Sequence, residues 1–141
     1  MRGLVLATAL TFTVLNSAAA DFLIQASPGG RIGDFLDLYA EIRASGRRVV
    51  IDGPCLSACT LVLSVVPRNR ICVTRRAVLG FHAAWRPDES GRPLTHRGAT
   101  RLMLDTYPPA VRSWIRRKGG LGRRTILLRG RELAAMYPRC G

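Results

Sequence analysis

Three short segments, each following an apolar run, carry the residue types that nucleophilic acyl transfer requires. They are Ser27-Pro28-Gly29-Gly30, then Gly53-Pro54-Cys55-Leu56-Ser57-Ala58-Cys59, and finally Gly80-Phe81-His82. A Gly-Gly turn offers unhindered backbone N–H groups to an oxyanion, a serine at a strand-to-helix turn is a nucleophile, and a histidine on a later strand is a base. Each feature alone is common in proteins. Their order and spacing therefore carry the prediction of a serine hydrolase site.

Alternating strand-like and helical patterns predict the elements that must position these segments. Residues 22–26 are apolar and end at the glycine turn, apolar positions recur at helical spacing over 32–42, and 49–51 is a β-branched run. Residues 57–66 are small and apolar, which favours a buried helix that begins near the serine. The other predicted elements are strands over 71–73, 77–81 and 125–128, an exposed loop over 85–95, helices over 99–106 and 108–117, and a terminal segment over 132–137.

This alternation predicts an α/β fold whose strands are largely parallel. In such a fold the loops that follow the strands gather at one carboxyl edge of the sheet, where α/β proteins usually bind ligands. The Gly29-Gly30 turn and the Ser57 turn are therefore expected to lie close together.

The first twenty residues have the pattern of a secretory signal peptide. Arg2 gives a positive start, residues 4–15 are apolar apart from threonines, and Ala18-Ala19-Ala20 matches the small-residue cleavage rule. Removing 20 of the 141 residues leaves 121, enough for a single domain over 21–141. The apolar stretch is short for a membrane span, and no later stretch replaces it. A periplasmic or secreted protein is therefore expected.

Four cysteines lie within that predicted domain, at Cys55, Cys59, Cys72 and Cys140. An oxidising compartment allows one or two disulfides, and the sequence does not choose among the pairings. A Cys-x3-Cys spacing with distant partners lacks the tight pairs of structural zinc sites, so we expect no metal site. We expect no other cofactor either.

The chain is strongly basic, with 22 basic and 9 acidic residues and a formal net charge of +13. Such an excess attracts anionic surfaces, polysaccharides and nucleic acid. The arginines are dispersed, however, which is typical of a solvated surface, and no specific nucleic-acid site is predicted. The densest cluster is a candidate for weak contact with an anionic or membrane surface, and consists of Arg112, Arg116, Arg117, Lys118, Arg123 and Arg124.

Residues 22–82 resemble the proteolytic subunit of the Clp protease and, more broadly, the crotonase-like fold, a spiral of strand-helix units. Ser27-Pro28-Gly29-Gly30 is similar to that family's oxyanion turn, Gly53-x-x-x-Ser57-Ala58 to its nucleophile elbow, and residues 78–82 to its histidine strand. The 25 positions from Ser57 to His82 also suit the family. Residues 125–137 resemble its terminal strand and helix more weakly.

The resemblance implies a role for each matching residue. Ser57 is the expected nucleophile and His82 the expected general base. The expected oxyanion donors are the backbone N–H groups of Gly29 or Gly30 and of Ala58.

The family's catalytic aspartate has no counterpart here. Arg124-Thr125 occupies its place, and no carboxylate lies between Asp105 and Glu132. Losing the orienting carboxylate of a serine triad costs about four powers of ten in rate. The candidate substitutes are Asp105, which is preferred because it lies on a predicted helix, and the loop residues Asp88 and Glu89. His96, also in the loop, is a weaker alternative base.

The chain departs from the family in two further ways. The predicted domain leaves no room for the strands and helix that normally precede the glycine strand, so a minimal or N-terminally shortened fold is expected. Export also separates the protein from an ATP-driven unfoldase, so no ATPase partner is implied, and a homo-oligomer stays open.

The sequence thus predicts an exported serine hydrolase, and more narrowly a peptidase that acts on a peptide or protein. The alternative is a catalytically inactive relative that binds a peptide or an envelope protein in the same cleft. The missing carboxylate leaves both open.

Overall fold

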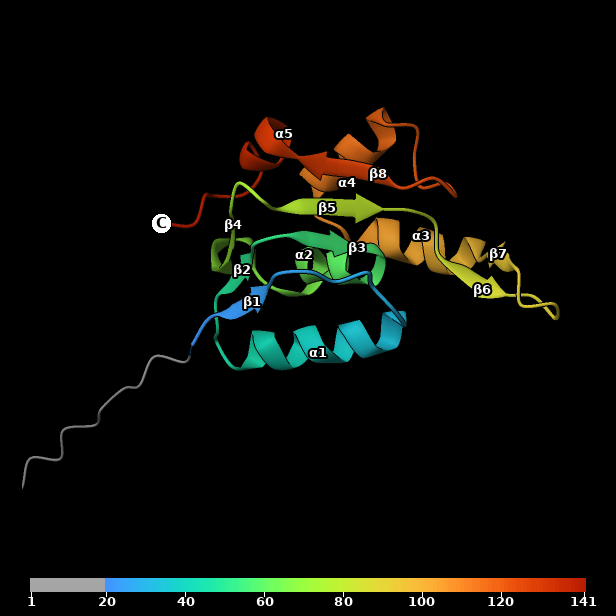
Figure 1. The fold of residues 1–141 in the computed structure, drawn as a ribbon, viewed down its shortest axis with the longest axis horizontal. Helices are drawn as coiled ribbons and strands as arrows, with labels where there is room; N and C mark the ends of the chain where they lie inside the picture. The colour runs from blue at the N-terminus through green and yellow to red at the C-terminus, as the bar shows by residue number, and fades with distance from the viewer. Residues whose placement is uncertain (1–19) are drawn as a thin grey trace, which may run out of the picture.

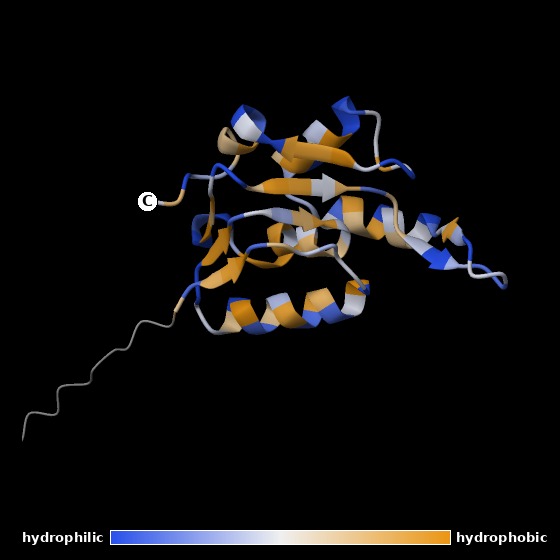
Figure 2. Ribbon diagram, viewed as in Figure 1, coloured by the Kyte–Doolittle hydropathy of each residue, from blue (hydrophilic) through white to orange (hydrophobic). Residues whose placement is uncertain are grey.

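Short apolar runs form the first sheet of the computed structural model, which describes residues 20–141 (Figure 1). Strands β1 (Phe22–Ile24), β2 (Val49–Ile51) and β4 (Ile71–Val73) pair in parallel in the order β1-β2-β4. β-branched side chains pack well on a buried pleated surface, and those of Ile51 and Val73 are fully buried. Figure 2 shows β1 and β2 as hydrophobic, whereas helix α1 (Ile32–Ala44) alternates between polar and apolar residues.

A second sheet carries the segments that the sequence singled out. Strand β3 (Pro54–Leu56) runs parallel to β5 (Val78–Phe81), and β8 (Ile126–Arg129) pairs with β5 in the antiparallel direction. The chain after β1 joins the two sheets. The Ser27 N–H donates to the Pro54 carbonyl at 2.8 Å, and the Leu56 N–H donates to the Ser27 carbonyl at 2.9 Å. The ends of β1, β3 and β5 therefore meet at one edge.

Helices pack against these sheets and bury the segment that follows β3. Helix α1 contacts the 3₁₀ helix η1 (Ser57–Leu61) and α2 (Val62–Val65). The Tyr39 hydroxyl on α1 donates to the Cys59 carbonyl at 2.8 Å. The other helices are η2 (Arg68–Arg70), α3 (Arg97–Thr106), α4 (Pro109–Arg117) and α5 (Gly130–Ala134).

Three aromatic side chains link the C-terminal helices to β5. The ring of Phe81 lies edge-on to Tyr107, with centroids 5.3 Å apart, and 5.8 Å from the centroid of Trp114 on α4. All three side chains are buried. Aromatic contacts of this kind add about 0.5–1.5 kcal/mol each beyond the area they bury. They hold the end of β5, and therefore the residue that follows it, against the core.

The structure confirms the α/β class and most predicted elements, but it corrects two of them. Strand β3 was not predicted, because it is short and begins at a proline, so the serine turn follows β3 instead of β2. Residues 85–95 are exposed as expected, yet they form a hairpin of β6 (Trp85–Pro87) and β7 (Pro93–Thr95). The Asp88 carboxylate closes this hairpin by accepting from the N–H groups of Ser90 and Arg92.

Two disulfides connect all four cysteines, Cys55 to Cys59 and Cys72 to Cys140. All four cysteines are thus disulfide-bonded, and none is a free thiolate that could bind zinc. Disulfides suit an extracellular or periplasmic location. The predicted signal peptide lies almost entirely outside the described residues. Within residues 20–141, no helix has the length and apolarity needed to cross a bilayer.

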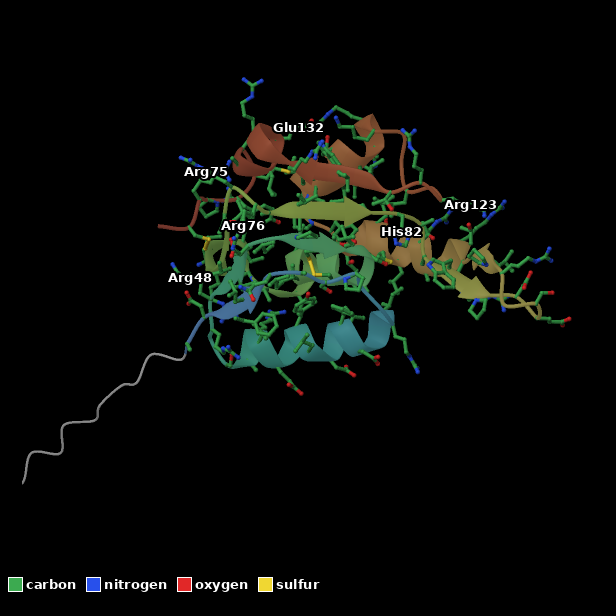
Figure 3. The ribbon with its side chains drawn as sticks, viewed as in Figure 1. Arg48, Arg75, Arg76, His82, Arg123 and Glu132 are labelled. Atoms are coloured by element: carbon green, nitrogen blue, oxygen red, sulfur yellow. A yellow bond between two sulfur atoms is a disulfide. The ribbon has the colours of Figure 1, made fainter. Side chains whose placement is uncertain are left out.

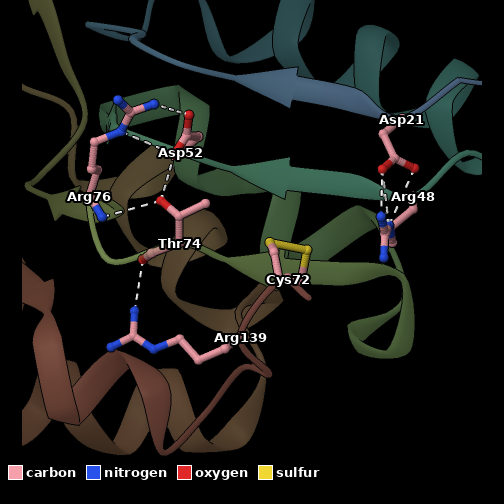
Figure 4. The surroundings of a disulfide bond; sticks show 8 residues. Asp21, Arg48, Asp52, Cys72, Thr74, Arg76 and Arg139 are labelled. Atoms are coloured by element: carbon pink, nitrogen blue, oxygen red, sulfur yellow. Dashed lines mark hydrogen bonds and ion pairs between the residues drawn. A yellow bond between two sulfur atoms is a disulfide. The ribbon is translucent and has the colours of Figure 1, made fainter.

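The second disulfide fastens the C-terminal end of the chain to β4 (Figure 4). It closes a loop with a sequence separation of 68. Two hydrogen bonds join the same two segments: the Val73 N–H donates to the Pro138 carbonyl at 2.9 Å, and the Arg139 guanidinium donates to the Thr74 carbonyl at 2.8 Å. The end of the chain is thus a part of the fold around β4.

We expect the double variant Cys72→Ala/Cys140→Ala to lose about 3–4 kcal/mol of unfolding free energy, because a long loop is no longer closed in the unfolded chain. Urea unfolding of the oxidised variant and wild type measures this loss. An unchanged midpoint would show that the disulfide does not constrain the unfolded protein.

An ion pair between the largely buried Asp52 and the exposed Arg76 lies near this disulfide (Figure 4). The Asp52 carboxylate pairs with Arg76 and accepts from the Thr74 hydroxyl at 2.7 Å, and its side chain is 15% exposed. The hydrogen bonds from Arg76 and then from Thr74 hold the pKa of Asp52 below its ordinary value of 3.8. The ionised carboxylate is therefore the form that stabilises the end of β2.

A group whose pKa is lowered by folding stabilises the protein above its unfolded pKa, and this contribution disappears as the pH falls through the folded pKa. We expect Asp52→Asn to be less stable than wild type at about pH 6, with a smaller difference at about pH 2.5. Urea unfolding at both values tests this. A difference that grows on acidification would contradict the ion pair.

Candidate active site

Ser57 has a backbone conformation that side chains other than glycine rarely adopt. Its φ is +56°, and it is the only non-glycine residue with a positive φ in the part of the chain that the structure describes. Such a conformation costs about 1–3 kcal/mol and persists only where the surroundings enforce it. Ser57 stands where β3 ends and η1 begins, and its side chain is half-buried. The turn therefore presents the hydroxyl at the start of a helical segment.

A disulfide and a chain of hydroxyl groups hold this turn. Cys55 and Cys59, both fully buried, are bonded across it. The Thr60 hydroxyl donates to the Ser57 carbonyl at 2.6 Å, and the hydroxyls of Thr60 and Tyr107 are also 2.6 Å apart. Because the Thr60 proton goes to the carbonyl, Tyr107 is the donor in the second bond. Burial raises the pKa of Tyr107 to about 12, so this donor keeps its proton at neutral pH.

The predicted oxyanion turn lies directly against Ser57. Gly29 has a φ of +86°, and a Cβ atom built on it would lie 2.6 Å from the Ser57 Cβ and 3.0 Å from the Ala58 nitrogen. Only glycine allows the two turns to approach this closely. The Gly29 N–H donates to the Ser27 hydroxyl at 3.3 Å. Within residues 20–141, the N–H groups of Gly30 and Ala58 have no acceptor, so these two are the available oxyanion donors.

His82 follows β5 and is oriented by the backbone. Its Nδ1 lies 2.8 Å from the carbonyl oxygen of Ala83, and since a carbonyl can only accept, Nδ1 carries the proton. In the neutral imidazole the lone pair is then on Nε2, which is the arrangement that a general base needs. A backbone carbonyl thus provides the orientation for which the sequence suggested a carboxylate.

Ser57, His82 and the glycine turn line the same cavity, which has a volume of about 640 Å³. The structure therefore brings together Ser57, His82 and the Gly29-Gly30 turn, which the sequence singled out in three separate segments. Most of the other residues in the cavity wall are apolar, namely Pro28, Ile32, Ala84, Trp85, Pro87 and Met103. The exposed Arg31 also lines the cavity and, among residues 20–141, is its one guanidinium.

None of the proposed substitute carboxylates lines this cavity. Asp105 is exposed on α3, and within residues 20–141 its carboxylate makes no hydrogen bond or ion pair. Asp88 closes the hairpin turn, and Glu89 is exposed beside it. Glu132 accepts from the Trp114 indole at 3.1 Å and pairs with Lys118 at 3.2 Å, contacts that lower its pKa.

The weaker candidate base, His96, has a structural role at the start of α3. Its Nδ1 accepts from the Ala99 N–H at 3.0 Å, which caps the helix. His96 lines neither of the two pockets that contain His82. His82 is therefore the histidine that the fold places with Ser57.

A second pocket, of about 410 Å³, lies on the other side of His82. It also contains Trp85 and, from the segment before β8, Arg123 and Thr125. The sequence placed Arg123 only in a surface cluster of basic residues. Its position near the histidine depends on the pairing of β8 with β5, which no local pattern in the sequence indicates.

No protein-family model and no curated protein matches the chain. The assignment of the site therefore depends on the placement of Ser57, His82 and the glycine turn. The likeness to the Clp protease subunit stays a prediction from the sequence motifs.

We expect Gly29→Ala to lower the unfolding free energy by at least about 2 kcal/mol, since a side chain there combines a strained φ with a collision against the Ser57 turn. Urea unfolding measures the loss. The matched control is Gly98→Ala in the first turn of α3, where a Cβ meets only ordinary contacts and alanine favours the helix. Equal stability of Gly29→Ala and wild type would show that the two turns do not touch.

Proposed function

We propose that this protein is an exported serine hydrolase that forms an acyl-enzyme on Ser57, and that its substrates are peptides or proteins. The observation that carries the proposal is the strained, left-handed Ser57 in a cavity that also contains His82 and the Gly29-Gly30 turn. Strained backbone costs free energy, and a fold retains it only where the surrounding contacts compensate for that cost. Such residues cluster at active sites, which is why the strain at Ser57 favours a catalytic role.

The first step of the proposed reaction is attack of the Ser57 Oγ on the substrate carbonyl carbon, while the hydroxyl proton passes to His82 Nε2. The carbonyl oxygen becomes an oxyanion, and the N–H groups of Gly30 and Ala58 donate to it. The position of Ala58 in the first turn of η1 places its N–H at a helix start, where negative charge is favoured. When the C–N bond breaks, His82 returns the proton to the leaving amine.

A water molecule then repeats these steps on the acyl-enzyme. It loses a proton to His82, adds to the ester carbonyl, and displaces Ser57, which regains its proton. Apart from Arg31, the side chains that line the cavity around Ser57 and His82 are mainly apolar, so an apolar side chain is the expected acyl portion of the substrate.

The Ala83 carbonyl replaces a triad carboxylate only in part. A carboxylate in this position fixes the tautomer of the histidine and also stabilises the imidazolium that forms during the reaction. The carbonyl fixes the tautomer equally well, but as a neutral dipole it stabilises the positive ring less. We therefore expect turnover slower than that of an intact triad, whose carboxylate contributes about four powers of ten.

We further propose a minimal crotonase-like fold over residues 21–141, similar to that of the Clp protease subunit. Three strand-turn units support this proposal: β1 leads into the glycine turn and α1, β3 into Ser57 and η1, and β5 into His82. These are the units in which the sequence motifs of that family occur.

One observation favours a second candidate, a catalytically inactive relative that binds a peptide or envelope protein. No carboxylate lines either pocket that contains His82, although such a group is the usual partner of a catalytic histidine. A binding protein would retain the cavity and the fold without needing an activated serine.

Fluorophosphonate labelling of the oxidised protein distinguishes the two candidates. We expect wild type to be labelled, and we expect Ser57→Ala and His82→Ala to lose the label, because the reagent reacts with a serine whose hydroxyl is activated by a base. His96→Ala is the matched control and retains labelling. A folded wild type that takes up no label would reject the hydrolase and favour the binding protein.

A further inference from the structure

His82 lies between two pockets, and the second one is built from segments distant in sequence. The antiparallel register pairs Phe81 with Ile126, and beyond that pair the Ala83 N–H donates to the Gly122 carbonyl at 2.7 Å. The segment from Gly122 to Thr125 is thereby fixed alongside the histidine. In Figure 3, His82 and Arg123 lie at the same end of the molecule, near the β6–β7 hairpin. The second pocket is lined by His82, Ala83, Trp85, Gly91, Pro93, Thr95, Arg123 and Thr125.

The proposed reaction defines which part of a substrate enters each pocket. In the proposed intermediate the acyl group is bonded to Ser57, and its carbonyl oxygen lies at the glycine turn. Of the two pockets that contain His82, only the first is lined by Ser57 and by Gly29 and Gly30. The leaving group takes its proton from His82, so it departs on the histidine side. Because the second pocket contains His82 but not Ser57, it is the place for the leaving-group portion.

The chemistry of the second pocket selects for negative charge. Arg123 lines it, and within residues 20–141 this guanidinium has no carboxylate partner and donates no hydrogen bond to another residue. Thr95 and Thr125, residues with hydroxyl groups, also line the pocket, and no aspartate or glutamate of the described chain lines it. A guanidinium matches the planar, bidentate geometry of a carboxylate.

We propose that this second pocket binds a carboxylate on the leaving-group side of the substrate, through Arg123. The proposal rests on the hydrolase function for the direction of the substrate, but the pocket itself can be tested by binding alone. The carboxylate is either the C-terminus of a short peptide or the side chain of an acidic residue after the scissile bond. The first source describes an enzyme that removes a C-terminal residue, and the second an endopeptidase selective for acidic residues.

Binding to the Ser57→Ala protein tests the pocket without turnover. Trp85 is 56% exposed and lines both pockets, whereas Trp114 is 1% exposed, so a ligand-dependent change in tryptophan fluorescence reports on the site. The probes are the dipeptides acetyl-Leu-Ala and acetyl-Leu-Asp-amide, with acetyl-Leu-Ala-amide and acetyl-Leu-Asn-amide as their neutral counterparts. Leucine is chosen for the apolar first pocket.

We expect the preferred carboxylate dipeptide to bind about three- to tenfold more tightly than its neutral counterpart, as for a charge-assisted contact that is partly open to solvent. Arg123→Gln in the Ser57→Ala background should abolish this preference. Arg124→Gln, which removes the same charge one residue further along and outside both pockets, should leave it intact. The dipeptide that shows the preference identifies the source of the carboxylate.

Equal binding of the charged and neutral dipeptides would overturn the proposal. So would an equal loss of the preference for the charged dipeptide in Arg123→Gln and Arg124→Gln, because that result would indicate only long-range attraction by the positive charge. The proposed function fails separately, when wild type takes no fluorophosphonate label. If the protein binds the carboxylate but takes no label, the anion pocket is supported and the hydrolase function is rejected. If it is labelled but shows no preference for the carboxylate, the hydrolase function is supported and the anion pocket is rejected.

Discussion

The left-handed backbone of Ser57 is the constraint on which the rest of the site depends. A residue with a side chain adopts this conformation only at a cost, so three independent contacts oppose relaxation of the turn. The Cys55–Cys59 disulfide closes it covalently, the hydroxyl of Thr60 holds the Ser57 carbonyl, and Gly29 packs on it from the end of β1. The first two contacts lie within residues 55–60, whereas Gly29 comes from the turn after β1. The conformation of one serine thereby links β1, β3 and η1.

The histidine is held by a second group of contacts, which are mainly aromatic. Phe81 precedes His82 and packs on Tyr107 and Trp114, so the junction of α3 and α4 supports the end of β5 from behind. Tyr107 belongs to both groups, because its hydroxyl also donates to Thr60 next to the serine turn. The segments that carry Ser57 and His82 are therefore supported by a common buried residue, although they follow different strands.

The sequence predicted the chemical groups of the site better than the backbone that orients them. Ser57, His82 and the glycine turn could be found because each is a distinctive residue type after an apolar run. The partner of His82 could not be found, since it is the carbonyl of Ala83, a backbone atom that every residue has. Arg123 was visible only as one arginine among many. Its place near His82 follows from a strand pairing between β5 and β8, which is a long-range contact without a local pattern.

The large positive charge of the chain makes the absence of a carboxylate beside His82 more costly for a protonated histidine. With 22 basic and 9 acidic residues in the chain, most arginines of the described part lack an acidic partner, and no aspartate or glutamate of that part lines either pocket that contains His82. Asp88 closes the hairpin turn, and Glu132 pairs with Lys118. An imidazolium on His82 would form in a positive field with no anion of the protein beside it. A substrate carboxylate held by Arg123 would lie in a pocket that His82 also lines, and its charge would favour the imidazolium. Substrate recognition and stabilisation of the protonated base would then depend on the same anion.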